Sequence, residues 1–360
     1  MTTADRASAL ARAIGACQAC DGVSCDELLA LVEQELGHSR ILDSPQDHGD
    51  LQCLALAPRT ILHIIAGNTA MAGIQSLIRG LLLGSHNRVK LPSADLPDLL
   101  SFIEALPANL KKLVEVNNEL PDEWLRSSQA VIVFGSDETI QHFRQQTRPG
   151  QIFIAHGHRI SFTVIFDDKN KDAAQLAARD VSLFDQQGCL SPHDIYVATG
   201  EHTDALQFAS ELAKEMQHFN QHCPRSKLSA AENAAITALR DSYDFRQTND
   251  PSVKLWTSEG CTDWTVIYEK EPQFAVSPLN RVVFVKELPK SMDLTQALFL
   301  VRPHLSSIAV HPFREEHFPS LLHLGASRIC PLGKAQQPSL FWHQDGLAPL
   351  SPLVRWIDIG

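Results

Sequence analysis

Short apolar runs alternate with helix-like stretches along the first half of the chain. Runs rich in β-branched residues predict buried strands, and apolar residues spaced three or four apart predict amphipathic helices. The predicted strands cover residues 60–66, 87–92, 130–135 and 151–157, and the predicted helices cover 71–84, 98–114 and 137–146. Strands that alternate with helices are typical of βαβ units, so we predict a parallel sheet with helices on its faces.

The second half continues this alternation and predicts a second α/β region. Strands are predicted at residues 159–167, 194–199, 264–268, 281–286 and 306–310, and helices at 169–184, 202–219, 229–241 and 293–300. Residues 244–262 predict a loop-rich stretch. At the start of the chain, residues 1–38 have a helical pattern and 39–58 predict an irregular connector.

The length of the chain favours two domains, because 360 residues exceed the usual size of one. We place the first domain at residues 1–155 and the second at 156–360.

Composition and charge remove some classes of function. Apolar residues make up 44% of the chain, and the formal charge is 31 − 42 = −11 without a basic stripe, so nucleic acid is not an expected partner. We find neither a signal peptide nor an apolar run long enough to span a membrane. We therefore expect a cytoplasmic protein whose eight cysteines are reduced thiols.

Glycines and polar residues follow the predicted strands of the first half. Open parallel sheets bind ligands beyond the carboxyl ends of their strands, so these residues form a candidate nucleotide site. They are Gly67, Asn68, Lys90, Ser93, Gly135, Ser136, His156 and His158. Each has a plain alternative, because the first pair suits a turn, Ser136 suits a helix N-cap, and a lysine or histidine is often only structural.

The turn at Gly135 and Ser136 would offer backbone N–H groups to a phosphate at the start of a helix. Asp137 and Glu138 follow it, and their charges would repel a tightly held pyrophosphate. The chain contains neither G-x-G-x-x-G nor G-x-x-x-x-G-K, so any dinucleotide must be held differently from the Rossmann fingerprint. It also lacks G-x-S-x-G, which argues against a serine hydrolase.

One cysteine lies in an unusual setting, the polar loop DQQGCLSPHD at residues 185–194. Cysteines are commonly buried among apolar residues, so Cys189 is either incidental or presented for chemistry. Cys261 lies on a second predicted loop and could compete with it.

A metal site is not expected. Cys17, Cys20 and Cys25 form C-x2-C-x4-C, but no second pair lies at zinc-ribbon spacing and no H-E-x-x-H motif is present.

Four segments resemble the LuxC-type acyl-CoA reductases, which are distant members of the aldehyde dehydrogenase superfamily. They are HIIAGNTAMAGIQSLIRGLLLGSHNRVKLPS (63–93), VIVFGSDETI (131–140), DQQGCLSP (185–192) and GASRICPLGKAQQPSLFWHQDG (325–346). The resemblance implies an α/β, aldehyde dehydrogenase-like fold, with an N-terminal Rossmann-like cofactor domain and an α/β catalytic domain.

The resemblance also implies roles for individual residues. Cys189 matches the catalytic cysteine, and Asn68 matches the asparagine that stabilises the oxyanion. Lys90 matches the lysine that contacts the cofactor ribose, and Gly135 and Ser136 match the turn beside the pyrophosphate. Ser93 shares the edge with Lys90 and is included in the cofactor site.

The segment IAHGHRIS (154–161) departs from the superfamily pattern. Hydrolytic aldehyde dehydrogenases carry a glutamate base there, whereas this chain has His156 and His158 and no acid. Without that carboxylate, water is activated less readily to hydrolyse an acyl-enzyme, which favours thioester reduction over aldehyde oxidation. His156 is the first candidate for acid–base work and His158 the second.

The resemblance therefore implies NADPH-dependent reduction of a fatty acyl thioester, carried on CoA or an acyl-carrier protein, to the aldehyde. NADH remains possible as the cofactor. The alternatives are a CoA-acylating aldehyde dehydrogenase running in the oxidative direction and a non-catalytic subunit that holds acyl groups. Related enzymes imply a homo-oligomer and two partners, an acyl-protein synthetase and a thioesterase. The tail FWHQDG (341–346) is distinctive, but its role cannot be inferred from the sequence.

Overall fold

The computed structural model describes residues 1–17, 22–67, 70–168, 172–288 and 293–360, which group into two compact units. The first unit contains Met1–His158 and Leu340–Gly360, and the second contains Arg159–Ser339. Residues 340–360, expected from the sequence to belong to the second half, therefore group with the first unit. The reason is packing: apolar residues of the tail lie in the first unit's core.

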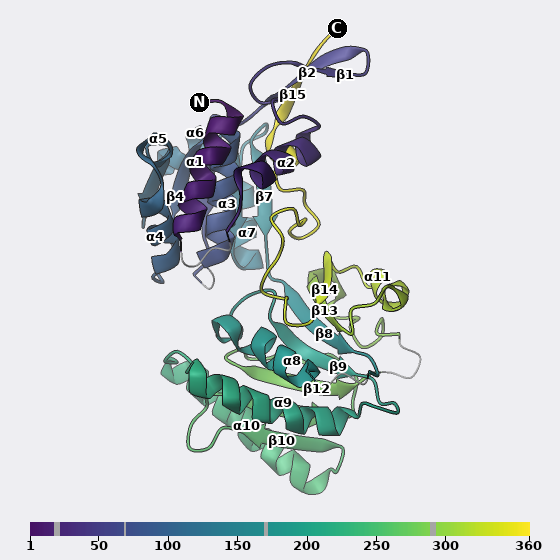
Figure 1. Ribbon diagram of the computed structural model, residues 1–360. Helices are drawn as coiled ribbons and strands as arrows, with labels where there is room; N and C mark the ends of the chain where they lie inside the picture. The colour runs from purple at the N-terminus through teal and green to yellow at the C-terminus, as the bar shows by residue number, and fades with distance from the viewer. Residues whose placement is uncertain (18–21, 68–69, 169–171, 289–292) are drawn as a thin grey trace. The chain divides into compact units, whose positions relative to one another are not determined.

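The first unit is built on a five-stranded sheet in which all neighbouring strands are parallel (Figure 1). In spatial order the strands are β5 (Val114–Asn117), β4 (His86–Lys90), β3 (Thr60–Ile64), β6 (Ala130–Phe134) and β7 (Ile152–His156). The chain places β4 and β5 on one side of β3, and then crosses to the other side of β3 to form β6 and β7. In such sheets this switch point opens a crevice at the carboxyl ends of the strands, where ligands bind.

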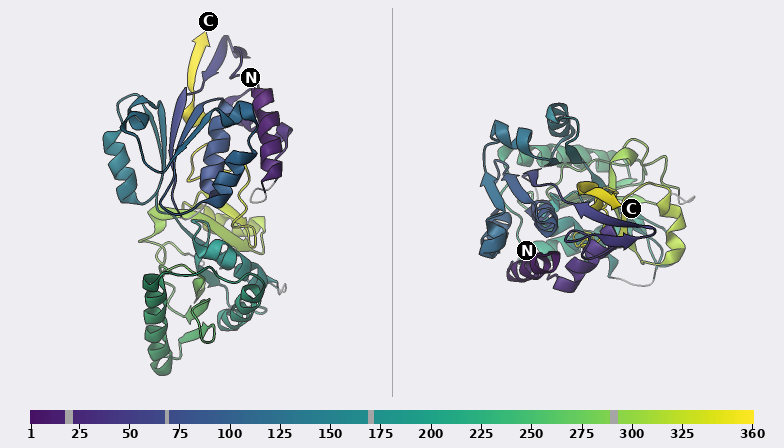
Figure 2. Two further views of the ribbon diagram at one scale, coloured as in Figure 1. Left: turned by 90° about the vertical axis from the view of Figure 1, so that its left-hand side faces the viewer. Right: turned by 90° about the horizontal axis from the view of Figure 1, so that it is seen from above.

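Helices cover both faces of this sheet, as the left view of Figure 2 shows. They are α1 (Thr3–Ala16), α2 (Cys25–Leu36), α3 (Ala70–Leu83), α4 (Pro97–Ala105), α5 (Ala108–Lys111), α6 (Asp122–Ser127) and α7 (Asp137–Gln146). The prediction of a parallel sheet with helices on its faces is confirmed. Gly84, with φ +82°, ends α3 in the left-handed conformation that glycine adopts readily.

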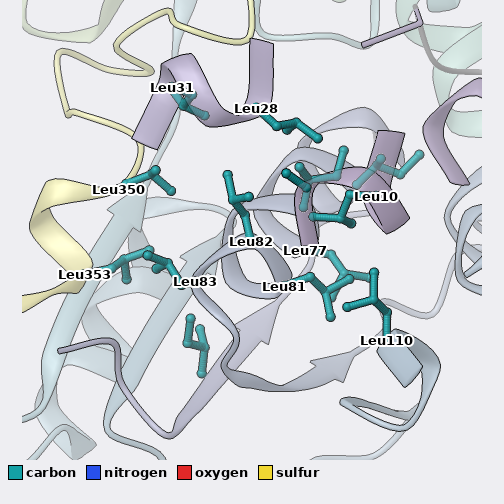
Figure 3. Packing of buried hydrophobic residues seen from close by; sticks show 14 of the residues in the cluster. Leu10, Leu28, Leu31, Leu77, Leu81, Leu82, Leu83, Leu110, Leu350 and Leu353 are labelled. Carbon is teal, nitrogen blue, oxygen red and sulfur yellow. The ribbon is translucent and has the colours of Figure 1, made fainter. Parts of the chain in front are cut away.

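Leucines form much of the core on one face of this sheet (Figure 3). They come from three N-terminal helices, from α5 and from the C-terminal tail. The labelled side chains are Leu10, Leu28, Leu31, Leu77, Leu81, Leu82, Leu83, Leu110, Leu350 and Leu353. The tail is therefore part of the first unit's hydrophobic core and not a loose end.

The prediction of an irregular connector at 39–58 is wrong. This segment contains β1 (Gln46–His48) and β2 (Leu51–Leu56), and β2 also pairs antiparallel with β15 (Arg355–Ile359) near the C-terminus. Much of the small sheet is exposed, and β1 and β15 lack the continuous apolar runs from which buried strands are predicted.

The second unit contains a seven-stranded sheet, parallel except for its edge strand β10. The spatial order is β10 (Val253–Thr257), β11 (Thr265–Glu269), β12 (Val282–Glu287), β9 (Pro192–Val197), β8 (Ile160–Ile165), β13 (Leu305–His311) and β14 (Arg328–Pro331). The helices are α8 (Ala173–Ser182), α9 (Ala205–His222), α10 (Ala230–Asn249) and α11 (Pro319–Leu322). Short 3-10 turns lie at Leu183–Gln186, Arg302–His304, Glu315–His317 and Ser351–Leu353, the last in the first unit.

Two local predictions in the second unit are wrong. Residues 244–262 are not mainly loop, because α10 continues to Asn249 and is followed by β10. The predicted helix at 293–300 forms turns instead, and residues 289–292 just before it lie outside the described part. No helix in the described ranges has both the length and the apolar character needed to cross a membrane.

A buried histidine network links β3, β4 and α3 inside the first unit. His63 Nδ1 lies 2.8 Å from Ser76 Oγ, and its Nε2 lies 3.0 Å from Asn87 Oδ1. Burial lowers the pKa of His63 from 6.5 to about 4, so the imidazole is neutral at neutral pH. A methyl group on Gly80 would lie 1.9 Å from Asn87 Oδ1, so this helix position must remain glycine for the network to form.

We predict that His63 makes stability fall on mild acidification. Between its folded and unfolded pKa values the unfolded chain binds a proton that the folded chain does not, so stability drops as pH falls below 6.5. In His63→Gln the free energy of unfolding should lose about 2 kcal/mol less than in the wild type between pH 7 and 5. Urea unfolding at both pH values measures this, with exposed His142→Gln as the control, and equal losses in His63→Gln and the wild type would contradict it.

Candidate functional site

Several predicted site residues share one edge of the first unit's sheet. Ile64 at the end of β3 pairs in register with Lys90 at the end of β4, and Phe134 at the end of β6 pairs with His156 at the end of β7. The strands are parallel, so their carboxyl ends meet along this edge. Lys90, Ser93, Gly135, Ser136, His156 and His158 therefore lie at or just beyond it.

The Gly135–Ser136 turn connects β6 to α7. The Ser136 hydroxyl accepts the backbone N–H of Thr139 at 3.3 Å, which is the N-cap bond. A Cβ on Gly135 would approach Thr139 Cγ2 to 3.0 Å, so glycine at this position allows the turn between β6 and α7 to pack closely against Thr139. The plain N-cap interpretation of Ser136 is therefore correct.

Acidic residues in the first turn of α7 limit how an anion can bind there. Asp137 and Glu138 are both exposed, and hydrogen bonding to Ser136 lowers the pKa of Glu138, which keeps that carboxylate ionised. A pyrophosphate can approach the turn from the side of Gly135 but not lie across the first turn of α7, because carboxylates repel it.

Two cofactor candidates lie on the neighbouring strand ends. Lys90 is half-buried at the end of β4, and Ser93 is exposed just beyond it. Gly67 follows β3 and is exposed. Asn68, the predicted oxyanion residue, lies outside the described residues.

His156 is the most tightly held of the polar residues on this edge. Its ring stacks on Phe134, with centroids 4.6 Å apart and planes 17° apart. Nδ1 lies 2.7 Å from Oδ2 of Asp345, and both side chains are buried, with exposures of 7% and 4%. The backbone carbonyl of His156 accepts the N–H of Gly135 at 3.2 Å, which joins the histidine to the Gly135–Ser136 turn.

His158, the second candidate, is placed differently. Its side chain is exposed, and its backbone N–H donates to Asp137 at 3.4 Å.

Asp345 is the functional candidate that sequence reasoning missed. It lies in the tail segment FWHQDG, 189 positions from His156, so no local pattern connects the two. The available signal was the Asp-Gly pair, which marks a turn. The left-handed φ of +55° at Asp345 fits that turn, since Asp and Asn tolerate this conformation better than most residues.

Cys189 belongs to the second unit, where it lies in the turn that leads from the 3-10 turn Leu183–Gln186 into β9. It is half-buried, and its carbonyl accepts the hydroxyl of Ser161 at 2.7 Å. Strand β9 follows the turn, so the thiol does not lie at the start of a helix.

The backbone just before Cys189 is strained and firmly held. Phe184, Asp185 and Gln186 have φ of 54°, 51° and 64°, a left-handed conformation that costs about 1–2 kcal/mol for each such residue. The buried Gln186 side chain donates to the carbonyls of Pro192 and Val282, both at 2.8 Å, and accepts the N–H of Val282 at 2.9 Å.

A second left-handed stretch, residues 279–281, holds the same loop from the other side. Asp185 forms an ion pair with Arg281 at 2.7 Å, and Gln187 donates to Asn280 at 2.8 Å. Arg281 is only 2% exposed, so water screens this pair poorly. These contacts fix the path of the chain into Cys189.

Two other cysteines of the second unit are placed differently. Cys330 is buried in β14, and burial raises the pKa of its thiol. Cys261 is exposed on a turn, where its carbonyl accepts Arg240 Nη1 at 2.6 Å. Cys189 is thus distinguished from both by its strained and hydrogen-bonded loop.

The residues on the first unit's edge suit a nicotinamide dinucleotide. The edge supplies the N–H groups of a helix start, a glycine that permits close approach and the cationic side chain of Lys90. No group of three or more histidine, cysteine or acidic side chains in the described part of the chain is arranged to hold a metal ion. Cys20, one of the weak metal candidates, lies outside that part.

Solved structures with similar folds are aldehyde dehydrogenases. An NAD-dependent benzaldehyde dehydrogenase from Corynebacterium glutamicum matches 100% of this chain and 86% of its own, with a TM-score of 0.64 and 13% identity. A succinic semialdehyde dehydrogenase from Streptococcus pyogenes, solved with NADP+, matches 99% and 90%, with a TM-score of 0.67 and 13% identity. The fold is therefore of the aldehyde dehydrogenase type.

A narrower class follows from the sequence as a whole. The acyl-CoA reductase (LuxC) family model matches residues 7–356, and the chain belongs to this family of oxidoreductases. It is similar to the long-chain acyl-protein thioester reductases of Aliivibrio fischeri, with 24% identity over 358 residues, and Photorhabdus luminescens, with 26% over 349. Each match covers 92% of this chain and 70% of the relative.

We predict that Gln186 is required for stability of the second unit. In Gln186→Ala one N–H and two carbonyls lose buried partners, so the free energy of unfolding should fall by about 2–4 kcal/mol. Urea unfolding measures the change, and Gln207→Ala, which removes an exposed glutamine, should cost less than about 0.5 kcal/mol. A similar small effect of both variants would refute the importance of these bonds.

Proposed function

We propose that the protein reduces a fatty acyl thioester to the aldehyde with NADPH, through an acyl group held on Cys189. The observation that carries this proposal is the half-buried Cys189 in a loop fixed by Gln186 and Arg281, in a chain of the acyl-CoA reductase family. The relatives named long-chain acyl-protein thioester reductases support the substrate class.

The first chemical step forms one bond and breaks another. The Cys189 thiolate attacks the acyl carbonyl carbon, and the carbon–sulfur bond to the carrier breaks, which leaves the acyl group on Cys189. The imidazolium of His156 gives a proton to the departing carrier thiolate and recovers one from water later in the cycle. One proton is thus consumed for each thioester, as reduction by a nicotinamide requires.

The second step reduces the acyl group. A bound reduced nicotinamide supplies a hydride to the carbonyl carbon, which brings the acyl group to the aldehyde level. The carbon–sulfur bond to Cys189 then breaks, so the aldehyde leaves and the thiolate is regenerated. Asn68 and a backbone N–H near the cysteine stabilise the oxyanion in both steps, and one such donor typically contributes about 3–4 kcal/mol.

The first unit's edge binds the cofactor in this proposal. Lys90 and Ser93 would hold the adenosine ribose side, and Gly135 and Ser136 would hold the pyrophosphate. Similar folds solved with NAD or NADP+ support a nicotinamide cofactor, and NADPH is preferred over NADH by family resemblance.

The replacement of the usual glutamate protects the acyl-enzyme. No carboxylate occurs in 154–161 to activate water there. Hydride transfer to the acyl group is therefore favoured over hydrolysis of the acyl-enzyme. The carrier is CoA or an acyl-carrier protein, and an acyl-protein synthetase, a thioesterase and further copies of this chain are the proposed partners.

We predict that Cys189→Ala abolishes reduction while Cys261→Ala retains it. Only the first variant removes the proposed nucleophile, and Cys261 is the matched exposed cysteine. Absorbance of NADPH, and of NADH in parallel, is followed after addition of a long-chain acyl-CoA or acyl-carrier protein. Mass spectrometry without cofactor should find the acyl group on Cys189 of the wild type.

Other outcomes identify the competing functions. Equal activity of Cys189→Ala and the wild type would eliminate Cys189 as nucleophile. Acylation of Cys189 without turnover of either cofactor would indicate a subunit that only holds acyl groups. Faster acyl-CoA formation from aldehyde than the reverse reaction, at matched concentrations, would favour the oxidative enzyme.

We predict that Lys90→Ala weakens cofactor binding. A charge-assisted hydrogen bond contributes roughly 1.5–3 kcal/mol, so the Kd for NADPH should rise by at least about tenfold. Fluorescence titration of NADPH measures this, with exposed Lys112→Ala as the control. An unchanged Kd in Lys90→Ala would remove Lys90 from the proposed site.

A further inference from the structure

The tail segment FWHQDG is tied to the first unit by three consecutive polar contacts. His343 lies 3.8 Å from the carboxylate of Glu35 in α2, and Gln344 accepts a hydrogen bond from Arg79 of α3 at 3.4 Å. Asp345 then meets His156 at the end of β7. Leu350 and Leu353 bury themselves in the leucine core a few residues later (Figure 3). The tail is therefore anchored on both sides of Asp345.

The contact between Asp345 and His156 differs from the other two in its length, because its atoms lie 2.7 Å apart, and both side chains are buried. A carboxylate only accepts, so the 2.7 Å contact places the proton of the neutral imidazole on Nδ1. The other ring nitrogen, Nε2, is then the one that gains and loses a proton. Stacking on Phe134 fixes the plane of the ring, and the bond to Asp345 fixes which of its two flipped orientations the ring adopts.

We propose that Asp345 is a positioning residue for His156, which keeps Nδ1 protonated and presents Nε2 for proton transfer. The inference rests on the proposed function, in which His156 protonates the departing thiolate, and it selects His156 over His158. The same Asp345 oxygen can accept the Nδ1–H whether the ring carries one proton or two.

The surrounding charges leave this role to Asp345. Arg79 from α3 is buried nearby, and burial lowers its pKa to about 10, so the guanidinium remains positive at neutral pH. Glu35 from α2 interacts with Arg79 and His343, whereas Asp137 from α7 bonds the backbone of His158. Among the described groups, the carboxylate bonded to the His156 ring is that of Asp345.

The backbone at Asp345 makes one substitution especially informative. Its φ of +55° is tolerated by asparagine, so Asp345→Asn removes the charge with little backbone strain. Asp345→Gly is the second variant, since glycine also accepts this conformation and deletes the side chain. Glu35→Gln is the matched control, because it removes a carboxylate that also contacts the tail but does not touch His156.

The kinetic test is a double-mutant cycle with Asp345→Asn and His156→Gln. In Asp345→Asn the kcat for thioester reduction should fall at least about tenfold while KM for the thioester changes less than about threefold. The same change in the His156→Gln background should have no further effect, because Asp345 acts through His156. Glu35→Gln should leave kcat near the wild-type value, and thermal unfolding of each variant shows whether it is folded.

A second measurement does not depend on activity. In protein labelled with nitrogen-15 in histidine rings, the His156 signal is identified by its loss in His156→Gln. The wild type should show the tautomer with hydrogen on Nδ1, and Asp345→Asn or Asp345→Gly should shift the population toward the other tautomer.

The outcomes separate this inference from the proposed function. Equal losses of kcat from Asp345→Asn in both backgrounds, wild-type kcat in that variant, or an unchanged tautomer would overturn the positioning role and leave the reductase intact. A wild type that reduces no acyl thioester would overturn the proposed function, and the tautomer measurement would still decide whether Asp345 sets the state of His156.

Discussion

Parallel pairing of β3, β4, β6 and β7 is the constraint on which the first unit depends. Parallel strands need a connection that returns the chain to the same starting edge, so at least one helix lies between successive strands of this sheet and the strands end together. Residues far apart in the chain, such as Lys90 and His156, thereby reach one edge without any contact between them. The polar side chains proposed for the site lie at this edge because the faces of the sheet are covered by apolar side chains of the helices.

Backbone strain lies beside the proposed site residues Cys189 and His156. In the described part of the chain, seven non-glycine residues have positive φ: Phe184, Asp185, Gln186, Leu279, Asn280, Arg281 and Asp345. Three precede Cys189, three belong to the segment bonded to that loop, and the last is the partner of His156. Strained residues persist only where surrounding bonds determine their conformation, and Gln186 and Arg281 provide such bonds. Strain is thus concentrated where side chains must be presented in one direction.

The sequence predicted those features that depend on local patterning. Helix α7 and the strands around it follow from apolar periodicity, and the Cys189 loop from a cysteine among polar residues. Strand β15 could not be found in this way, because all its residues are exposed and its partner β2 lies far earlier in the chain, with Asp358 opposite Cys53, 305 positions away. Asp345 was missed because its contact with His156 joins residues 189 positions apart, and no short motif contains both.

The first unit is encoded in two pieces, and this affects how the protein is made. Synthesis proceeds from the N-terminus, and N-terminal regions begin folding first. When His158 has left the ribosome, all five strands of the parallel sheet exist, but Leu350, Leu353 and Asp345 have not yet been translated. The nascent unit must wait, with part of its leucine core uncovered, for the whole second unit to be synthesised. A chain interrupted before residue 345 therefore carries His156 without this carboxylate, so the proposed pair is complete only after the second unit has been translated.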